Sequence, residues 1–154
     1  TREEVNYMLQ SPFELIRARQ LLLDARQQAL EAVRAFAAAG VPVAVASNSA
    51  RFELAAKMRS LGLAQIFAGR VFSYEDVPRP KPWPDMYLAA AAACGAAPQD
   101  CVVVEDSVPG VRAGRAAGCR VMGFCHESPA GVLAAHGAEP FADMTALPGL
   151  LLGA

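Results

Sequence analysis

The stretch Cys101–Asp106 ends an apolar, β-branched run at two adjacent carboxylates. Cys101–Val104 is followed at once by Glu105 and Asp106. In an α/β protein whose sheet is covered on both faces, such a run predicts a central parallel strand, and ligands bind just beyond the carboxyl ends of such strands. Magnesium takes few carboxylates and fills its remaining positions with water and phosphate. We therefore predict that Asp106, with Glu105 beside it, binds Mg²⁺.

Two other stretches carry groups that suit a phosphate. Ser47 and Asn48 follow the apolar run Val41–Ala46. A hydroxyl and backbone N–H groups at this place can donate to phosphate oxygens, helped by the N-terminus of the next helix. Lys81 lies in the proline-rich loop 78–84, whose prolines make the backbone stiff and extended. Its ammonium group can neutralise a phosphate, so we predict that Ser47, Asn48 and Lys81 bind the substrate.

Each of these stretches alone also has a plainer interpretation. The acidic pair suits a solvated strand end or a helix cap, the lysine suits an ordinary surface position, and the Ser-Asn pair suits a turn. Together, however, a hydroxyl, an ammonium and two carboxylates form a coherent set for binding phosphate and magnesium. Their joint occurrence therefore favours a shared site.

Strand and helix patterns alternate along the chain. Helical spacing of apolar residues predicts helices, and short apolar runs predict strands. The expected helices cover 24–39, 51–61, 86–94, a segment after Asp106, 129–136 and 144–152, and the expected strands cover 41–46, 70–73, 101–105, 120–124 and 140–142. Asp85 is expected to cap the helix over 86–94. The alternation predicts an α/β fold with a parallel sheet and right-handed crossovers.

The helix expected after Asp106 carries three glycines, Gly110, Gly114 and Gly118, at intervals of four residues. A nucleotide-binding loop would need the spacing GxGxxG, which this series lacks. Glycine on one face of a helix lets the helix approach a sheet closely. We therefore predict tight packing of this helix on the sheet.

Three motifs in this order resemble the haloacid dehalogenase superfamily. They are SNS at Ser47, KPxPD at Lys81, and VVVEDS followed by GVxAxxAAG, which includes Glu105 and Asp106. More narrowly, residues 25–150 are similar to the β-phosphoglucomutase and sugar-phosphate phosphatase branch. The resemblance implies a Rossmann-like three-layer sandwich with a mostly parallel sheet. It also implies that Ser47 and Lys81 act in catalysis on the transferring phosphoryl group, that Asp106 ligates magnesium, and that Glu105 assists directly or through water.

One element of the family pattern is missing. The family's nucleophile is the first aspartate of a DxD motif at the end of the first strand, and the second aspartate acts as general acid and base. Residues 1–23 contain no such strand, and Asp24 stands alone. The family places that strand between those expected at 41–46 and 101–105, where its loss would leave a gap flanked by two strand edges. We expect a nucleophile outside the 154 residues, a remnant of a helical cap over 1–23, and the Rossmann-like core over 24–154.

The resemblance implies a magnesium-dependent phosphohydrolase that acts on a sugar or sugar-acid phosphate through an aspartyl-phosphate. A phosphomutase of the same fold and a non-catalytic binding domain remain open alternatives. A DxD strand upstream in the gene would separate the enzymes from the binding domain. A signalling receiver domain combines similar groups, but there the acidic pair comes first and the lysine last, whereas Ser47 and Lys81 precede the acids here.

Composition excludes several other classes. A net charge of −1 over 154 residues offers no basic surface for nucleic acid. No stretch reaches the roughly 20 apolar residues that span a bilayer. The four cysteines show neither CxxC nor histidines at zinc spacing, so we expect buried, reduced thiols and a cytoplasmic protein. We expect a monomer that binds a small phosphorylated substrate, with a strand-swapped dimer as the alternative.

Overall fold

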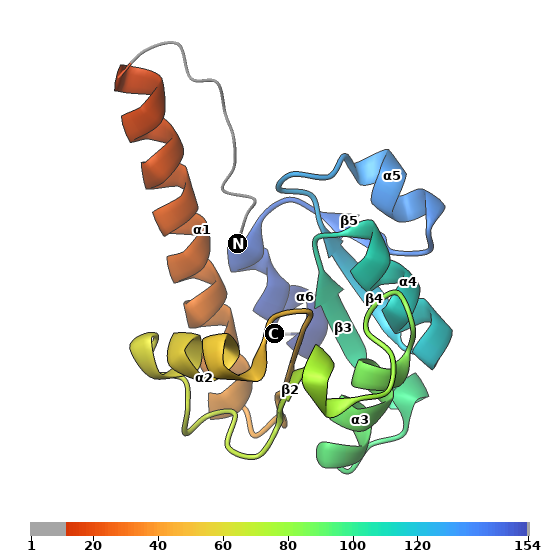
Figure 1. The fold of residues 1–154 in the computed structure, drawn as a ribbon. Helices are drawn as coiled ribbons and strands as arrows, with labels where there is room; N and C mark the ends of the chain where they lie inside the picture. Colours follow the sequence, from red (N-terminus) through yellow and green to blue (C-terminus); the bar gives the residue numbers. More distant parts are fainter. Residues whose placement is uncertain (1–11, 154) are drawn as a thin grey trace.

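Helices and short strands alternate along the chain (Figure 1). The structure is a computed structural model and describes residues 12–153. The α-helices are α1 (Pro12–Ala38), α2 (Arg51–Ser60), α3 (Asp85–Ala93), α4 (Val108–Ala117), α5 (Ala130–Ala135) and α6 (Leu147–Leu152). The strands are β1 (Val45–Ser47), β2 (Val71–Ser73), β3 (Val102–Glu105), β4 (Arg120–Phe124) and β5 (Glu139–Phe141). The short 3-10 helices within residues 12–153 are η2 (Tyr74–Asp76), η3 (Pro98–Asp100) and η4 (Met144–Ala146).

The strands form two parallel sheets. β1 pairs with β2, while β3, β4 and β5 are hydrogen-bonded in that order. Every strand pair in residues 12–153 is parallel, which confirms the predicted α/β fold with a parallel sheet. β3 was expected to be a central strand but lies at the edge of its sheet, because the described residues offer it no partner on the side of β1.

Helices cover the three-stranded sheet on both faces, because successive side chains of a strand point to opposite faces. Val121 of β4 lies in one apolar cluster with Val111 of α4 and Leu133 of α5. The next residue, Met122, lies in a second cluster with Ala32 of α1 and with residues of η4 and α6. The three-layer arrangement implied by the family resemblance is therefore confirmed.

Helix α4 packs closely on the sheet, as its glycines predict. A Cβ atom at Gly114 would lie 2.7 Å from Val121 Cγ2 and 3.2 Å from Val103 Cγ1, which leaves no room for a larger residue. Gly118 ends the helix in the left-handed region, with φ at 91°. The series thus serves packing and helix termination.

Helix α1 runs without a break through the position at which the sequence pattern divides a cap remnant from the core. It spans Pro12–Ala38 and so joins the helix expected over 24–39 to the residues before it. Residues 1–11 of the cap remnant lie outside the described residues, and the division into 1–23 and 24–154 stays a prediction. Neither this helix nor another in the described part of the chain is long and apolar enough to cross a membrane.

The strand expected over 41–46 is shorter than predicted and ends one residue later. Only Val45–Ser47 pairs with a neighbouring strand. Pro42 has no N–H to donate, and the partner strand β2 is only three residues long. Residues 41–44 therefore have no strand residues in the described part of the chain with which to form backbone hydrogen bonds.

The prediction that Asp85 caps α3 is wrong. Asp85 is the first helical residue, and no side chain caps this helix through a hydrogen bond. Its carboxylate is instead bound by the Arg79 guanidinium at 2.9 Å. An ion pair across the loop therefore outcompetes the local cap.

The four cysteines are all free thiols. Cys119 is buried, but the other three are partly exposed. The prediction of burial is therefore right for Cys119 alone, while Cys101 and Cys125 are partly buried and pack against the same apolar cluster.

Candidate active site

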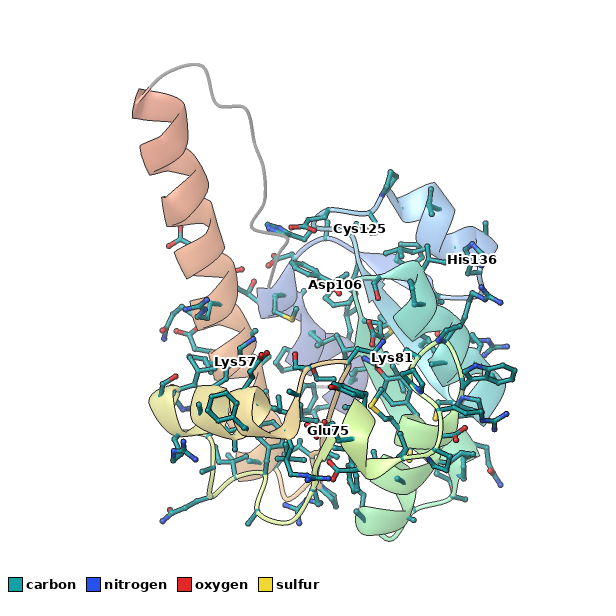
Figure 2. All side chains as sticks on the ribbon, viewed as in Figure 1. Lys57, Glu75, Lys81, Asp106, Cys125 and His136 are labelled. Carbon is teal, nitrogen blue, oxygen red and sulfur yellow. The ribbon has the colours of Figure 1, made fainter. Side chains whose placement is uncertain are left out.

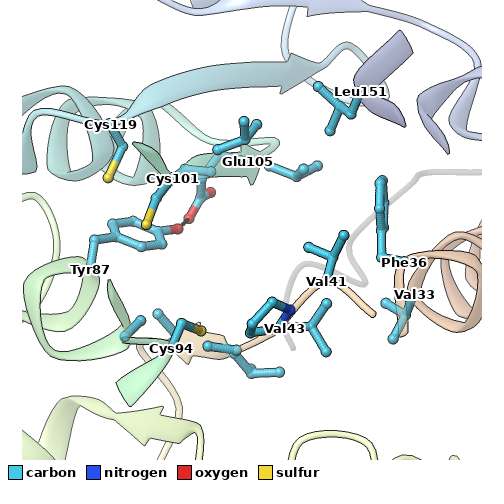
Figure 3. A pocket seen from close by; sticks show the side chains of 18 of the residues that line it. Val33, Phe36, Val41, Val43, Tyr87, Cys94, Cys101, Glu105, Cys119 and Leu151 are labelled. Atoms are coloured by element: carbon cyan, nitrogen blue, oxygen red, sulfur yellow. Dashed lines mark hydrogen bonds between the residues drawn. The ribbon is translucent and has the colours of Figure 1, made fainter. Parts of the chain in front are cut away.

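A cavity of about 740 Å³ separates β1 from β3 (Figure 3). Most of its lining is apolar and comes from several elements, including Val43 before β1, Val104 of β3, Phe36 of α1 and Leu151 of α6. In residues 12–153, β1 and β3 are each hydrogen-bonded to another strand on the side away from this cavity only. The described part of the chain thus contains a gap between two strand edges.

Two of the three stretches singled out from the sequence line this cavity, through Lys81 and through Glu105 and Asp106 (Figure 2 labels Lys81 and Asp106). The third is joined to them by hydrogen bonds from Asn48 to Lys81. Lys81 Nζ donates a hydrogen bond of 2.9 Å to the carbonyl of Ala46 in β1. The same ammonium donates to the carboxylate of Glu105, the last residue of β3, and Asp106 follows directly. The carboxyl ends of two parallel strands therefore meet at one rim, as expected, while the chemical role of each residue stays a prediction.

The Glu105 carboxylate is buried and surrounded by donors. Its Oε1 accepts from the Lys81 ammonium and from the Tyr87 hydroxyl, and its Oε2 accepts from Ser107 Oγ at 3.2 Å. A carboxylate accepts about four hydrogen bonds, so little capacity remains for a metal. The geometry favours Glu105 as the counter-ion that orients Lys81, and its predicted part in metal binding stays a prediction.

The Tyr87 hydroxyl stays protonated and so can donate its hydrogen bond to the Glu105 carboxylate. Burial, and secondly the negative charge of Glu105, raise the pKa of Tyr87 far above its usual range. The hydroxyl therefore keeps its proton at neutral pH.

The Lys81 ammonium is enclosed but retains one N–H for a ligand. Its side chain is 11% exposed, and the face of the Tyr87 ring lies 5.1 Å from Nζ. An ammonium group has three donors, and two of them are directed at Ala46 and Glu105. The third is assigned to no atom of residues 12–153, so it is available to an anion at the cavity mouth.

Lys81 is expected to react with an amine-acylating reagent at least about tenfold more slowly than Lys57. The sequence contains only these two lysines, and Lys57 is exposed on α2, whereas Lys81 is enclosed and ion-paired. Mass spectrometry after partial acylation measures both rates in one sample, with Lys57 as the internal reference. Equal rates would contradict the enclosed ion pair.

Asn48 holds the lysine loop with its side chain. Its Oδ1 accepts from the backbone N–H of Lys81 at 3.2 Å, and its Nδ2 donates to the carbonyl of Lys81 at 3.4 Å. Because the side chain of Asn48 is engaged with Lys81, only its backbone N–H remains for the predicted contact with the substrate.

The proline-rich loop around Lys81 is not extended as expected. The backbone N–H of Trp83 donates to the carbonyl of Pro80 at 2.9 Å and closes a turn.

A carboxylate occupies the N-terminus of α2. The backbone N–H of Arg51 donates to Glu75 at 2.6 Å, and the Arg51 guanidinium binds Asp76 at 2.7 Å. The first amide of this helix, which was expected to assist phosphate binding, is thus engaged. The Ser47 hydroxyl donates its one proton to Ser49 Oγ at 3.0 Å, so it would have to rotate away from Ser49 to donate to a phosphate, and its role at the end of β1 stays a prediction.

Asp106 is the open carboxylate of the site. Its side chain is exposed at the rim, yet partial loss of hydration and, secondly, the charge of Glu105 raise the pKa of Asp106. A nearby cation would relieve both effects. No group of three histidine, cysteine or acidic side chains gathers at a metal position within the described residues. Magnesium needs only one or two protein carboxylates, so Asp106 fits a site completed by water and phosphate.

Two residues to which the sequence analysis assigned no role complete the Glu105 environment. Ser107 directly follows the acidic pair, and its hydroxyl caps α4 by accepting from Gly110 N–H at 3.2 Å. A serine between a strand and a helix is a signal for such a cap. Tyr87 offered no comparable signal, because an aromatic residue near the start of a helix usually indicates core packing.

Curated proteins similar to this chain include two phosphatases. The bifunctional riboflavin kinase/FMN phosphatase of Arabidopsis thaliana is 48% identical over 84 residues, which cover 54% of this chain and 22% of that protein. Hexitol phosphatase A of Escherichia coli (strain K12) is 45% identical over 85 residues, which cover 54% of this chain and 38% of that protein. The chain thus spans well under half the length of either relative.

A solved structure shares the fold. A haloacid dehalogenase family hydrolase from Deinococcus radiodurans R1, crystallised with bound phosphate and sodium, is 36% identical with a TM-score of 0.74. The similarity covers 82% of this chain and 58% of that one. The sequence model of the haloacid dehalogenase-like hydrolases matches residues 2–118, which is more than half of the chain. The chain therefore belongs to the haloacid dehalogenase-like hydrolase family, as its three motifs predicted.

Proposed function

We propose that the protein is a magnesium-dependent phosphohydrolase acting on a small phosphorylated metabolite, a sugar or sugar-acid phosphate. The observation that carries the proposal is an ammonium with one unassigned N–H beside an open carboxylate at one cavity mouth. Lys81 suits the phosphoryl oxygens, and Asp106 suits the cation that accompanies them. The names of the similar FMN phosphatase and hexitol phosphatase A support a phosphate ester as substrate.

The gap between β1 and β3 supports a nucleophile carried by an additional strand. In a parallel ladder, alternate residues direct their backbone groups to opposite sides. Val45 bonds toward β2 and Cys101 toward β4, so the backbone groups of Ala46 and Val104 face the gap. A strand outside the 154 residues would pair with both edges, join the two sheets, and end at the rim that carries the ammonium.

A carboxylate at the end of that strand would attack the phosphorus atom of the ester. The bond between phosphorus and the ester oxygen would break, and the leaving alkoxide would take up a proton from the second aspartate of the DxD motif, the family's general acid. Water then hydrolyses the aspartyl-phosphate, which releases inorganic phosphate and restores the carboxylate. The third N–H of Lys81 would bind a phosphoryl oxygen throughout. Magnesium held by Asp106 would supply further neutralisation of phosphate charge.

The proposed setting is a monomer in the cytoplasm. Four unpaired thiols support a reducing compartment. A strand exchanged with a second copy is the alternative way to fill the gap, and it would appear as a dimer in size-exclusion chromatography.

Phosphate release from a panel of sugar and sugar-acid phosphates tests the proposed function. We expect the full-length gene product to hydrolyse at least one panel member, and chelation by EDTA to lower the rate at least about a hundredfold. Added Mg²⁺ is expected to restore the rate. A protein that contains a DxD strand, verified by mass spectrometry, and yet releases no phosphate from the panel would refute the proposal.

A further inference from the structure

We propose that Tyr87 is a positioning residue, which holds the Glu105 carboxylate and through it directs the Lys81 ammonium toward the cavity mouth. The role of this arrangement rests on the proposed function, in which Lys81 binds a phosphate. The contacts among Tyr87, Glu105 and Lys81 are independent of that function. Tyr87 comes from α3 and Glu105 from the end of β3, and Figure 3 shows the tyrosine hydroxyl directed at that carboxylate.

Tyr87 makes two contacts with the ion pair. Its hydroxyl and the Lys81 ammonium donate to the same oxygen, Oε1 of Glu105. Its ring lies 5.1 Å from Lys81 Nζ, within the range in which an aromatic face attracts a cation. One side chain therefore fixes both the anion and the direction of the cation bound to it.

Ser107 and Gly110 lie against other sides of the carboxylate. Ser107 Oγ lies 3.2 Å from Oε2, and a Cβ atom at Gly110 would lie 1.9 Å from Glu105 Cδ. The Asn48 side chain holds the backbone of Lys81 at the other end of the lysine side chain. Tyr87 thus supplies the contact that keeps the carboxylate turned toward the lysine rather than into the cavity.

A role in core packing alone is the competing explanation for Tyr87. The residue also packs against the apolar cluster that contains Val111 and Val121. Packing needs the ring, whereas positioning needs the hydroxyl. Tyr87→Phe keeps the ring and its volume and removes only the hydroxyl, so this substitution separates the two roles.

The test measures how fast the ammonium protons of each lysine exchange with water. In the ¹⁵N-lysine-labelled protein, the two signals compared are those of Lys57 and Lys81, the two lysines of these 154 residues. We expect the wild-type Lys81 ammonium to exchange more slowly than that of Lys57, and Tyr87→Phe to speed exchange at Lys81 about tenfold while Lys57 is unchanged. The matched control Tyr74→Phe removes the hydroxyl of an exposed tyrosine and is expected to change neither signal.

Exchange at Lys81 that stays within twofold of wild type in Tyr87→Phe would overturn the proposal. So would an equal change at both lysines, which would indicate general loosening. Should Tyr87→Phe fail to fold, the wild-type chain still decides the matter, because the Tyr87 hydroxyl proton bound to Glu105 must give a slowly exchanging signal, and its absence would overturn the proposal. None of these measurements needs turnover, so a protein without phosphatase activity leaves the positioning inference testable and separately refutable.

Discussion

Asp106→Asn is expected to lower magnesium-dependent phosphate release by the full-length protein at least about a thousandfold. Asparagine has nearly the shape of aspartate but carries no charge, so the change removes the proposed cation ligand and little else. The carboxylate that it replaces is the open one, whereas Glu105 already accepts hydrogen bonds from three side chains. Glu105 is therefore not free to take over as the cation ligand.

Unfolding is not expected to explain this loss. The pKa of Asp106 is raised in the folded state, so its ionised form is disfavoured there, and the charge lowers stability at pH values above that pKa. Removing the charge at neutral pH should leave the free energy of unfolding equal or higher, as urea denaturation can measure. The control is Glu127→Gln, which removes an exposed carboxylate near Asp106 and is expected to keep activity within about threefold. Undiminished turnover in Asp106→Asn would exclude the assigned metal role.

The rim of the site follows from the sequence because it depends on where strands end. Apolar runs stop at Ser47 and Glu105, and parallel strands bring their carboxyl ends to one edge. Lys81 reaches the same edge, where its ammonium contacts both strand ends. Local pattern and one topological rule are therefore sufficient to gather these residues.

Contacts between elements could not be predicted in the same way. The bond from Tyr87 to Glu105 depends on where α3 lies relative to the end of β3, and no residue spacing encodes that placement. The carboxylate of Glu75 at the start of α2 likewise comes from η2, 24 residues away. The difference between Glu105 and Asp106 could not be predicted for the same reason. Both are carboxylates at a strand end, and only the residues that contact them distinguish the two.

Gly110→Ala is expected to lower the free energy of unfolding by about 3 kcal/mol. A Cβ atom there would lie 1.9 Å from Glu105 Cδ and 2.0 Å from its Oε2. The carboxylate would have to turn away, leaving the enclosed Lys81 ammonium and the Tyr87 hydroxyl without their acceptor. Urea denaturation followed by circular dichroism measures the change, and the single tryptophan, Trp83, gives a second signal beside the site.

The direction of this effect is diagnostic, because helix propensity alone favours alanine over glycine by about 1 kcal/mol. The matched control Gly131→Ala lies in α5 with no atom within 4 Å of the added carbon, and it is expected to be neutral or slightly stabilising. In a Glu105→Ala background the clash disappears, so Gly110→Ala should then cost less than about 1 kcal/mol. An equal cost in both backgrounds would place the strain in the helix backbone and contradict the clamped carboxylate. A cost that depends on Glu105 would show that the glycine leaves room for the counter-ion of Lys81.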